Sequence, residues 1–134
     1  MANQKKILIV DDDYELSDGL RTVLEAQGHK VIQARDGQQG KNLIYQETPD
    51  LVILDMMMPR MGGYPVLEHF RDKKEAPPII MITANEGSRH KAYAEYLGVV
   101  AYIRKPFAME KLIDAVKKGL EMGPTEVKQE DESV

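Results

Sequence analysis

Five residues have the chemical types needed for one acidic, cation-binding site: Asp11, Asp12, Asp55, Thr83 and Lys105. Each of them ends or closely follows a short apolar run of the sequence. Partly buried carboxylates repel one another, and a hard divalent cation relieves that repulsion. Mg²⁺ suits such a group because it accepts a few carboxylate and carbonyl oxygens, keeps several waters and admits a phosphate oxygen. The residue types therefore predict a magnesium site formed by Asp11, Asp12 and Asp55.

The same five residues would also serve the transfer of a phosphoryl group. An aspartate beside a bound cation can attack a phosphoryl donor as a nucleophile, and the cation offsets the charge that builds on the transferring group. In this sequence Asp55 would be the nucleophile, Lys105 would supply a second positive charge, and Thr83 would donate a hydrogen bond to a phosphoryl oxygen. Phosphoryl transfer mainly requires positioning and charge stabilisation, and these residues would provide both.

Five apolar, mostly β-branched runs predict the strands that would position these side chains. The runs are short and do not alternate with polar residues, as is typical of a parallel sheet covered by helices on both faces. They are Lys6–Val10, Val31–Ala34, Leu51–Leu54, Ile79–Ile82 and Val100–Ile103. Ligands of open α/β sheets bind beyond the carboxyl ends of the strands, so we expect the reactive residues to converge at that edge.

Amphipathic stretches separate the predicted strands. Apolar residues recur at helical spacing from Leu16 to Leu24 and from Met109 to Leu120, which places one apolar stripe on each helix. Gly28 and Gly98 stand just before the next strand, where helix C-caps belong. The alternation predicts an α/β fold, a doubly wound sandwich of five βα units.

Four sequence blocks resemble the signature segments of response-regulator receiver domains. They read ILIVDDD, PDLVILDMMMP, MITA and AYIRKPF, and each lies at the carboxyl end of a predicted strand. One such block alone would mean little, but the four occur in order, and the resemblance extends from about Lys5 to Leu120. It implies a five-stranded parallel sheet in the flavodoxin-like order 2-1-3-4-5.

The resemblance assigns roles to the metal-binding residues. Asp55 would be the phosphorylation site and would also contact Mg²⁺. Asp12 would bind the ion directly, and Asp11 would bind it through water. Met57 would contribute its backbone carbonyl. Met57 and Asn85 would flank the phosphoryl group, and because neither is a good base, we expect slow self-dephosphorylation.

The resemblance also implies a conformational switch. Thr83 would be the switch hydroxyl, Lys105 would pair with the phosphate, and Tyr102 would be the aromatic residue that changes rotamer. The peptide bond Lys105–Pro106 would be cis. In this family a sensor histidine kinase or a phosphotransfer protein donates the phosphoryl group. The altered face, made by the fourth helix, fifth strand and fifth helix, would bind an effector protein or a second copy of the chain.

Two positions depart from the family pattern. Gly40 stands where a helix of the family usually carries alanine, which would weaken that helix by about 1 kcal/mol. The apolar stretch Val99–Ala101 replaces one that is commonly polar. This stretch would be either core or part of a partner contact.

Composition excludes several other classes of protein. The chain has 134 residues, enough for one domain, and a net charge of −4, of which the last ten residues carry most. Its near-neutral body lacks the basic surface needed for direct nucleic-acid binding. It has no cysteine, hence no disulfide or thiolate site.

No apolar run is long enough for a signal peptide or a membrane helix, so we expect a cytoplasmic protein without membrane contact. Residues 1–122 are predicted to form the domain, and residues 123–134 an acidic disordered tail or linker.

Some of these residue types have ordinary structural explanations. Asp13 is predicted to cap the first helix. The methionine cluster at positions 56–58 and 61 is predicted to fill irregular gaps near loops rather than bind a soft metal. His29, His69 and His90 have no ligand spacing and are expected at the surface without a role.

Three other functions remain as alternatives. A flavin-binding protein of the same fold would need a Ser/Thr/Gly-rich phosphate loop after the first strand, where this chain has Asp11–Asp13. An aspartate-dependent phosphatase would need an acid/base two residues after Asp55, at the position that Met57 occupies. A receiver-like interaction module without phosphorylation would have no need for the complete set of site residues. The preferred prediction is a receiver that catalyses only its own phosphorylation and dephosphorylation and is not an enzyme otherwise.

Overall fold

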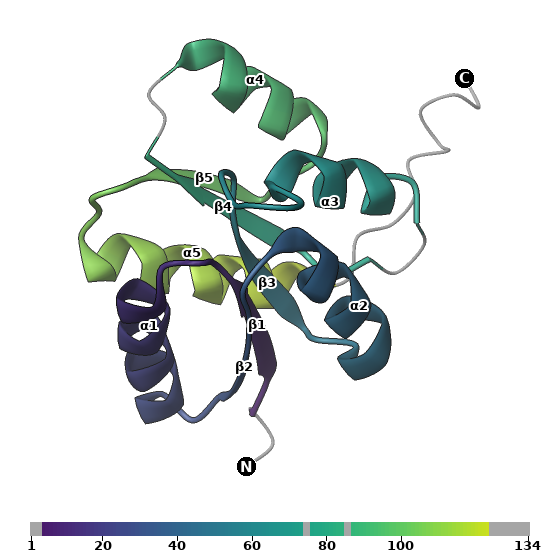
Figure 1. Ribbon diagram of the computed structural model, residues 1–134. Coiled ribbons are helices and arrows are strands. Elements are labelled where there is room, and N and C mark those ends of the chain that lie inside the picture. Colours follow the sequence, from purple (N-terminus) through teal and green to yellow (C-terminus); the bar gives the residue numbers. More distant parts are fainter. Residues whose placement is uncertain (1–3, 74–75, 85–86, 124–134) are drawn as a thin grey trace.

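The computed structural model describes residues 4–73, 76–84 and 87–123. Strands and helices alternate along the chain (Figure 1). The elements are β1 (Lys6–Val10), α1 (Tyr14–Ala26), β2 (Lys30–Ala34), α2 (Gly37–Glu47), β3 (Leu51–Asp55), α3 (Gly63–Phe70), β4 (Ile79–Thr83), α4 (Ser88–Tyr96), β5 (Ala101–Arg104) and α5 (Met109–Met122). The strands form one parallel sheet in the order β2-β1-β3-β4-β5, which confirms the predicted fold class and strand order.

All five predicted strands are present, with ends shifted by at most one residue. The shifts matter at the site, because Asp55 and Thr83 are the last residues of β3 and β4 and not the first residues of loops. Asp55 is in register with Ile82, and Thr83 with Arg104. The sheet ladder therefore fixes the backbone from which both side chains project.

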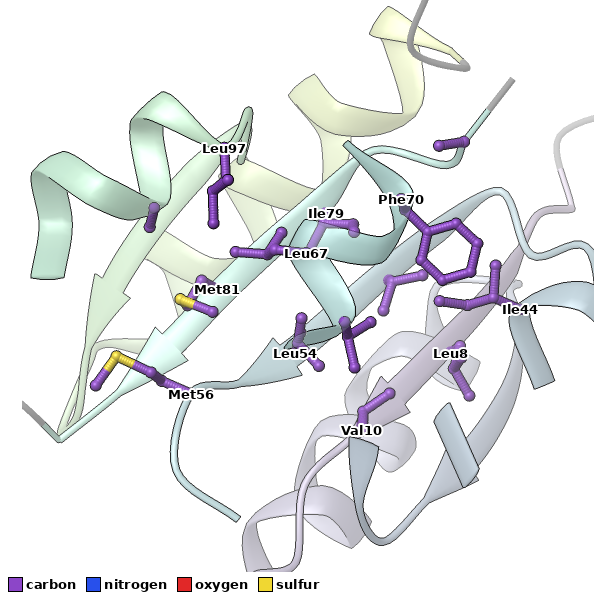
Figure 2. Packing of buried hydrophobic residues seen from close by; sticks show 14 of the residues in the cluster. Leu8, Val10, Ile44, Leu54, Met56, Leu67, Phe70, Ile79, Met81 and Leu97 are labelled. Carbon is purple, nitrogen blue, oxygen red and sulfur yellow. The ribbon is translucent and has the colours of Figure 1, made fainter. Parts of the chain in front are cut away.

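Helices cover both faces of the sheet and form two separate apolar layers. On one face α2, α3 and α4 pack over side chains that include Leu8, Leu54 and Met81 (Figure 2). On the other face α1 and α5 pack over side chains that include Ile7 and Ile53. Successive strand residues point to opposite faces, so an uninterrupted apolar strand supplies both layers. This is why the central strands β1, β3 and β4 are apolar along most of their length.

Helix ends follow the local signals of the sequence. The Asp13 side chain accepts a hydrogen bond of 3.1 Å from the Leu16 amide and caps α1, as predicted. Gly28 and Gly98, next to the ends of α1 and α4, have φ angles of +95° and +97°. Residues with a Cβ rarely adopt that left-handed conformation, which explains glycine at both positions. No helix in the described ranges is both long and apolar enough to span a bilayer.

The packing of α2 against the sheet explains why position 40 is glycine, although glycine is a poor helix former. It is buried on the side of α2 that faces β1, and a Cβ at this position would lie 2.9 Å from both γ carbons of Val10. Val10 is itself fully buried. The glycine therefore lets α2 approach the sheet closely. The lower helix propensity of glycine is the cost of that close packing.

Alanine at position 40 is consequently expected to destabilise the protein. Overpacking a core costs about 1–3 kcal/mol, which exceeds the gain of about 1 kcal/mol in helix propensity. We expect Gly40→Ala to lower the free energy of unfolding by about 1 kcal/mol in urea denaturation followed by circular dichroism. The control is Gly19→Ala in α1, where a Cβ would meet nothing within 4 Å. This substitution is expected to raise the free energy of unfolding, because alanine has the higher helix propensity. Equal stabilisation by both substitutions would contradict the packing explanation.

The stretch Val99–Ala101 belongs to the core more than to the surface. Val99 packs against the layer under α2, α3 and α4. Val100 and Ala101 pack against the layer under α1 and α5. Each is partly buried, so of the two predicted explanations the core position is the one that the packing supports. The predicted tail lies outside the described residues beyond Gly123.

Candidate functional site

Three carboxylates meet at the carboxyl edge of the sheet. Asp11 and Asp12 directly follow β1, and Asp55 ends the neighbouring strand β3. One oxygen from each of the three lies within 4.8 Å of the others. Asp11 and Asp55 are only 1% and 4% exposed, whereas Asp12 is open to solvent. The structure thus brings together the predicted acidic residues, with one ligand accessible from outside.

Asp11 is held in place by two hydrogen bonds. Its Oδ1 accepts from the Asp13 backbone amide at 2.8 Å, and its Oδ2 accepts from Lys105 Nζ at 3.2 Å. Burial raises the pKa of the Asp11 carboxyl, and these two contacts partly offset the rise. The Asp11 carboxylate is therefore held in one orientation at the edge of the sheet.

Asp55 is the carboxylate with the most perturbed ionisation. Its pKa is raised to about 7, first by burial and next by the nearby charge of Asp11, while Lys105 and a backbone hydrogen bond from Met57 lower it. Lys105 Nζ lies 3.6 Å from Asp55 Oδ1. Asp11 and Asp12 both raise this pKa, and Lys105 is the cation that lowers it, so a further positive charge at the site would favour the ionised form of Asp55.

Lys105 links the two buried aspartates to β4. Its ammonium group contacts Asp11 and Asp55, and its backbone amide donates to the Thr83 carbonyl at 2.7 Å. The Lys105–Pro106 peptide bond is cis, as expected. Thr83 itself is fully buried. Four of the five reactive residues are thus connected by ion pairs, by a hydrogen bond or by adjacent strands, and Asp12 completes the group at the surface.

The charges of the site fit a divalent cation. With all three aspartates ionised, three negative charges face the single ammonium of Lys105 among the residues that contact them. The remaining charge equals that of one divalent ion, and the donors are hard carboxylate oxygens of the kind Mg²⁺ prefers. Asp11, Asp12 and Asp55 therefore fit the ion that the sequence predicts.

Ionisation of Asp55 should make stability depend on pH. Its folded-state pKa, about 7, lies above the ordinary value of 3.8, so the folded protein retains a proton that the unfolded chain loses at lower pH. This contribution to stability is complete below pH 3.8 and is lost as the pH rises through about 7. Each unit of pKa shift corresponds to about 1.4 kcal/mol.

Asp55→Asn is therefore expected to stabilise the metal-free protein at pH 8 by on the order of 2 kcal/mol. At pH 5 the gain should be much smaller, because Asp55 is then largely protonated in the wild type. Urea denaturation in EDTA at both pH values measures the difference. Asp114→Asn, at an exposed position of α5, is the control and should show no such change. Equal gains for Asp55→Asn at pH 5 and pH 8 would contradict the assigned ionisation.

Tyr102 lies beside the site on the face covered by α4. Parallel register pairs it with Met81, so Thr83 and Tyr102 project from the same face of adjacent strands. The Tyr102 hydroxyl is buried and has no hydrogen-bond partner among the described residues. Burial raises the pKa of this phenol. An unsatisfied buried hydroxyl costs free energy, so no hydrogen bond from the described residues stabilises this orientation of the Tyr102 side chain.

An apolar hollow next to Asp12 was not predicted. It has a volume of about 530 Å³ and is lined by Asp12, Met56, Met57, Met58, Pro59, Tyr64 and His90. Met56, Met58 and Met61 pack against the core, whereas Met57 is 61% exposed, so Met57 does not fill a gap near the loop as predicted for the methionine cluster. Asn85, the other predicted flanking residue, lies outside the described ranges.

The histidines differ from the prediction that they lie at the surface. All three are half-buried, and each has a hydrogen-bond partner. His90 stacks on Tyr64 with ring centroids 6.0 Å apart, and its carbonyl accepts from the Tyr64 hydroxyl at 2.9 Å. This contact joins the start of α3 to α4 beside the hollow. The three histidines form no metal-binding group with one another among the described residues.

The loop that follows Asp55 is anchored to α2 by contacts that were also not predicted. Arg60 donates to Asp36 Oδ2 through Nε at 2.9 Å and through a terminal guanidinium nitrogen at 2.6 Å. The Gly37 amide donates to the Met61 carbonyl at 2.7 Å. The hydrogen bonds from Gln39 and Arg60 lower the pKa of Asp36. The loop that carries Met57 is thereby fixed at a second point away from the sheet.

The fold and site together define a doubly wound α/β domain with a cluster of three aspartates at a topological switch point. Comparison with known proteins gives the family. Residues 7–117 match the response regulator receiver domain family, and the chain belongs to that family.

Solved structures agree with this assignment. A CheY-like response regulator receiver domain protein from Methanospirillum hungatei JF-1 is 30% identical, with 90% of this chain and 96% of that chain covered and a TM-score of 0.83. The receiver domain of the Francisella response regulator 1452 is 28% identical, with coverage of 89% and 98% and a TM-score of 0.83. The non-phosphorylated HemR receiver domain from Leptospira biflexa is 27% identical, with coverage of 87% and 94% and a TM-score of 0.80.

Proposed function

We propose that the chain is a phospho-accepting receiver of a two-component or phosphorelay system, with Asp55 as the acceptor. The observation that carries the proposal is a buried carboxylate at the end of β3 that faces both a lysine and two further aspartates. A sensor histidine kinase or a phosphotransfer protein would donate the phosphoryl group in the cytoplasm. Residues 1–122 would be the receiver, and the segment that follows would be a tail or linker.

The metal site of the proposal is formed by Asp11, Asp12, Asp55 and the backbone carbonyl of Met57. A bound Mg²⁺ would supply positive charge to the transferring phosphoryl oxygens. Asp12 is the exposed member and admits a ligand from solvent. Asp11 is the positioned member, because the Asp13 amide and Lys105 fix both of its oxygens.

The chain's own residues have distinct tasks in the transfer. Asp55 contributes the attacking oxygen, and its contact with Lys105 orients the carboxylate. Lys105 then pairs with a phosphoryl oxygen, while the Thr83 hydroxyl donates to another. The phosphohistidine nitrogen of the donor is the leaving group, and the P–N bond breaks as the P–O bond to Asp55 forms. The apolar lining around Met57 limits the approach of water to the phosphorus, which would prolong the lifetime of the acyl phosphate.

A small phosphodonor tests the proposal without a cognate kinase. Incubation with acetyl phosphate and Mg²⁺ is expected to add the mass of one phosphoryl group to the intact chain, as measured by mass spectrometry. EDTA should prevent the addition. Absence of any addition with Mg²⁺ present would favour the alternative, a receiver-like interaction module without phosphorylation.

A further inference from the structure

The β3–α3 loop, residues 57–62, contains a backbone turn of an uncommon kind. The Met61 amide donates to the Pro59 carbonyl at 2.7 Å, and a hydrogen bond between residues two apart defines a γ-turn, here centred on Arg60. Arg60 has a φ angle of 65°. A γ-turn with a positive central φ is the rarer and more strained form, and residues with a long side chain seldom adopt it. Contacts from outside the loop must therefore hold this turn in place.

The start of α2 supplies such contacts. Arg60 donates to Asp36 Oδ2 twice, through Nε at 2.9 Å and through a terminal guanidinium nitrogen at 2.6 Å. The Gly37 amide donates to the Met61 carbonyl at 2.7 Å. A Cβ at position 37 would collide with that carbonyl oxygen, so the approach requires glycine. Two consecutive residues of the loop are thus bonded to two consecutive residues at the start of α2.

Asp36 is a firmly held partner because both of its carboxylate oxygens are engaged. Oδ1 accepts from the Gln39 amide at 2.9 Å and caps α2, while Oδ2 accepts from Arg60. Asp36 is buried, although most of the Arg60 side chain is exposed. Two charge-assisted hydrogen bonds to a buried carboxylate hold more strongly than an ordinary surface ion pair. The Asp36–Arg60 pair therefore ties the γ-turn to a fixed point of α2.

The same loop carries Met57, which lies next to the acidic site. The Met57 backbone amide donates a hydrogen bond to the Asp55 side chain. Under the proposed function, on which this inference rests, the Met57 carbonyl is also a ligand of Mg²⁺. Both are backbone groups, so their positions depend on the dihedral angles of the loop and not on the methionine side chain. Whatever fixes the loop therefore fixes two groups of the site.

We propose that the Asp36–Arg60 pair and the Gly37 amide position the β3–α3 loop for Mg²⁺ binding before the ion arrives. The three residues are positioning residues, because none of them is a proposed ligand. The apparent dissociation constant of a ligand rises as the fraction of protein in the binding-competent conformation falls. A loop released from α2 would spend part of its time in less strained conformations. Mg²⁺ affinity should then fall although every proposed ligand is present.

Two single substitutions and their combination test the proposal in metal-free protein titrated with Mg²⁺. Asp36→Asn removes the charged acceptor of Arg60 but keeps an oxygen for the Gln39 amide, since asparagine caps helices about as well as aspartate. Arg60→Asn removes the guanidinium group, and asparagine tolerates a positive φ. Each substitution is expected to raise the Mg²⁺ dissociation constant roughly three- to tenfold. The amide shifts of Asp12 and Asp55 in NMR spectra measure it.

The signs of the two single effects separate positioning from charge. Asp36→Asn removes a negative charge and Arg60→Asn a positive one, so charge alone would weaken Mg²⁺ binding in the first variant and strengthen it in the second. Positioning predicts weaker binding in both. The double variant has the net charge of the wild type and should bind no more weakly than the weaker single variant, because one pair is lost only once. Opposite signs, or wild-type affinity in the double variant, would overturn the proposal.

The matched control breaks an ion pair at the other end of α2. Glu47→Gln removes the partner of Lys6, whose Nζ lies 3.3 Å from Glu47 Oε1, and should change Mg²⁺ affinity by less than about twofold. An equal loss of affinity in Glu47→Gln would show a general effect of α2 and contradict the positioning role. Arg60→Lys, which keeps the charge, should recover part of the affinity that Arg60→Asn loses.

Hydrogen exchange supplies a readout that involves no metal. The Gly37 amide, which donates to the Met61 carbonyl, should exchange faster in Arg60→Asn than in the wild type, because the loop that carries its acceptor is released. The Ile53 amide, in the middle of β3, should keep its protection. Unchanged protection of Gly37 in Arg60→Asn would show that the loop does not depend on the pair.

The wild type distinguishes a failure of this proposal from a failure of the proposed function. Mg²⁺ binding and phosphorylation by acetyl phosphate in the wild type, with unchanged Mg²⁺ affinity in the Asp36 and Arg60 variants, would overturn the positioning role and leave the receiver function in place. A wild type that binds no Mg²⁺ would overturn both.

Discussion

Replacing Asp55 with asparagine is expected to abolish phosphorylation by acetyl phosphate. Asparagine has nearly the same shape, so the change removes the nucleophilic oxygen and leaves the packing around the 4% exposed side chain intact. No neighbouring carboxylate can substitute efficiently. Asp11 already accepts hydrogen bonds on both of its oxygens, and Asp12 lies at the solvent-exposed side of the cluster. Intact-mass spectrometry should therefore find no phosphorylated Asp55→Asn protein under conditions that modify most of the wild type.

The matched control is Asp13→Asn. It removes the same charge from the same sequence cluster, but asparagine caps helices about as well as aspartate, so α1 should keep its first turn. The Asp13 side chain accepts a hydrogen bond from the Leu16 amide and is not one of the proposed cation ligands. We expect its phosphorylation rate to remain within about twofold of the wild-type rate. Full incorporation in Asp55→Asn, or complete loss in Asp13→Asn, would show that the acceptor or the cap has been assigned wrongly.

The strands and the acidic site could be predicted because their signals are local in sequence. Each buried strand is a continuous apolar run, and a reactive residue marks its carboxyl end, so Asp11, Asp55 and Thr83 converge as soon as the strands are parallel. The order of the strands was predicted from the family resemblance, because the sequence of a strand does not show which other strands pair with it. The cap at Asp13 could be predicted for the same local reason, as one side chain serves an amide three residues later.

The unpredicted features depend on contacts between distant residues. The Asp36–Arg60 pair joins residues 24 apart, and Arg60 adopts a left-handed φ of 65° that no turn residue signals. The contact between Tyr64 and His90 spans 26 residues. In the run of three methionines, Met56 is buried and Met57 exposed, a difference that depends on where β3 ends. The raised pKa of Asp55 depends mainly on how deeply the fold buries this carboxyl, and only next on the nearby Asp11, whose approach the sequence already predicts.

Thr83→Ala is expected to accept phosphate and yet to switch incompletely. Thr83 and Tyr102 project from the same face of β4 and β5, and the buried Tyr102 hydroxyl has no hydrogen-bond partner among the described residues. A phosphoryl group on Asp55 would draw the Thr83 hydroxyl toward it, and the space vacated would admit Tyr102. Without the hydroxyl, Thr83→Ala is not drawn toward the phosphoryl group, so this movement no longer opens space for the Tyr102 ring. Asp55 and Lys105 still provide the groups needed for phosphoryl transfer.

The expected size of the effect follows from two magnitudes. A hydrogen bond to a charged group contributes about 1.5–3 kcal/mol, whereas a shift from 1:99 to 99:1 requires about 5.5 kcal/mol. Thr83 alone therefore cannot drive the switch, and Lys105 or a bound partner must supply the remainder. After saturating phosphorylation, the amide shifts of α4, β5 and α5 in Thr83→Ala should fall to roughly half of the wild-type amplitude. Thr83→Ser, which restores the hydroxyl, should recover nearly all of it. Wild-type amplitude in Thr83→Ala would show that Tyr102 responds to phosphorylation by another route.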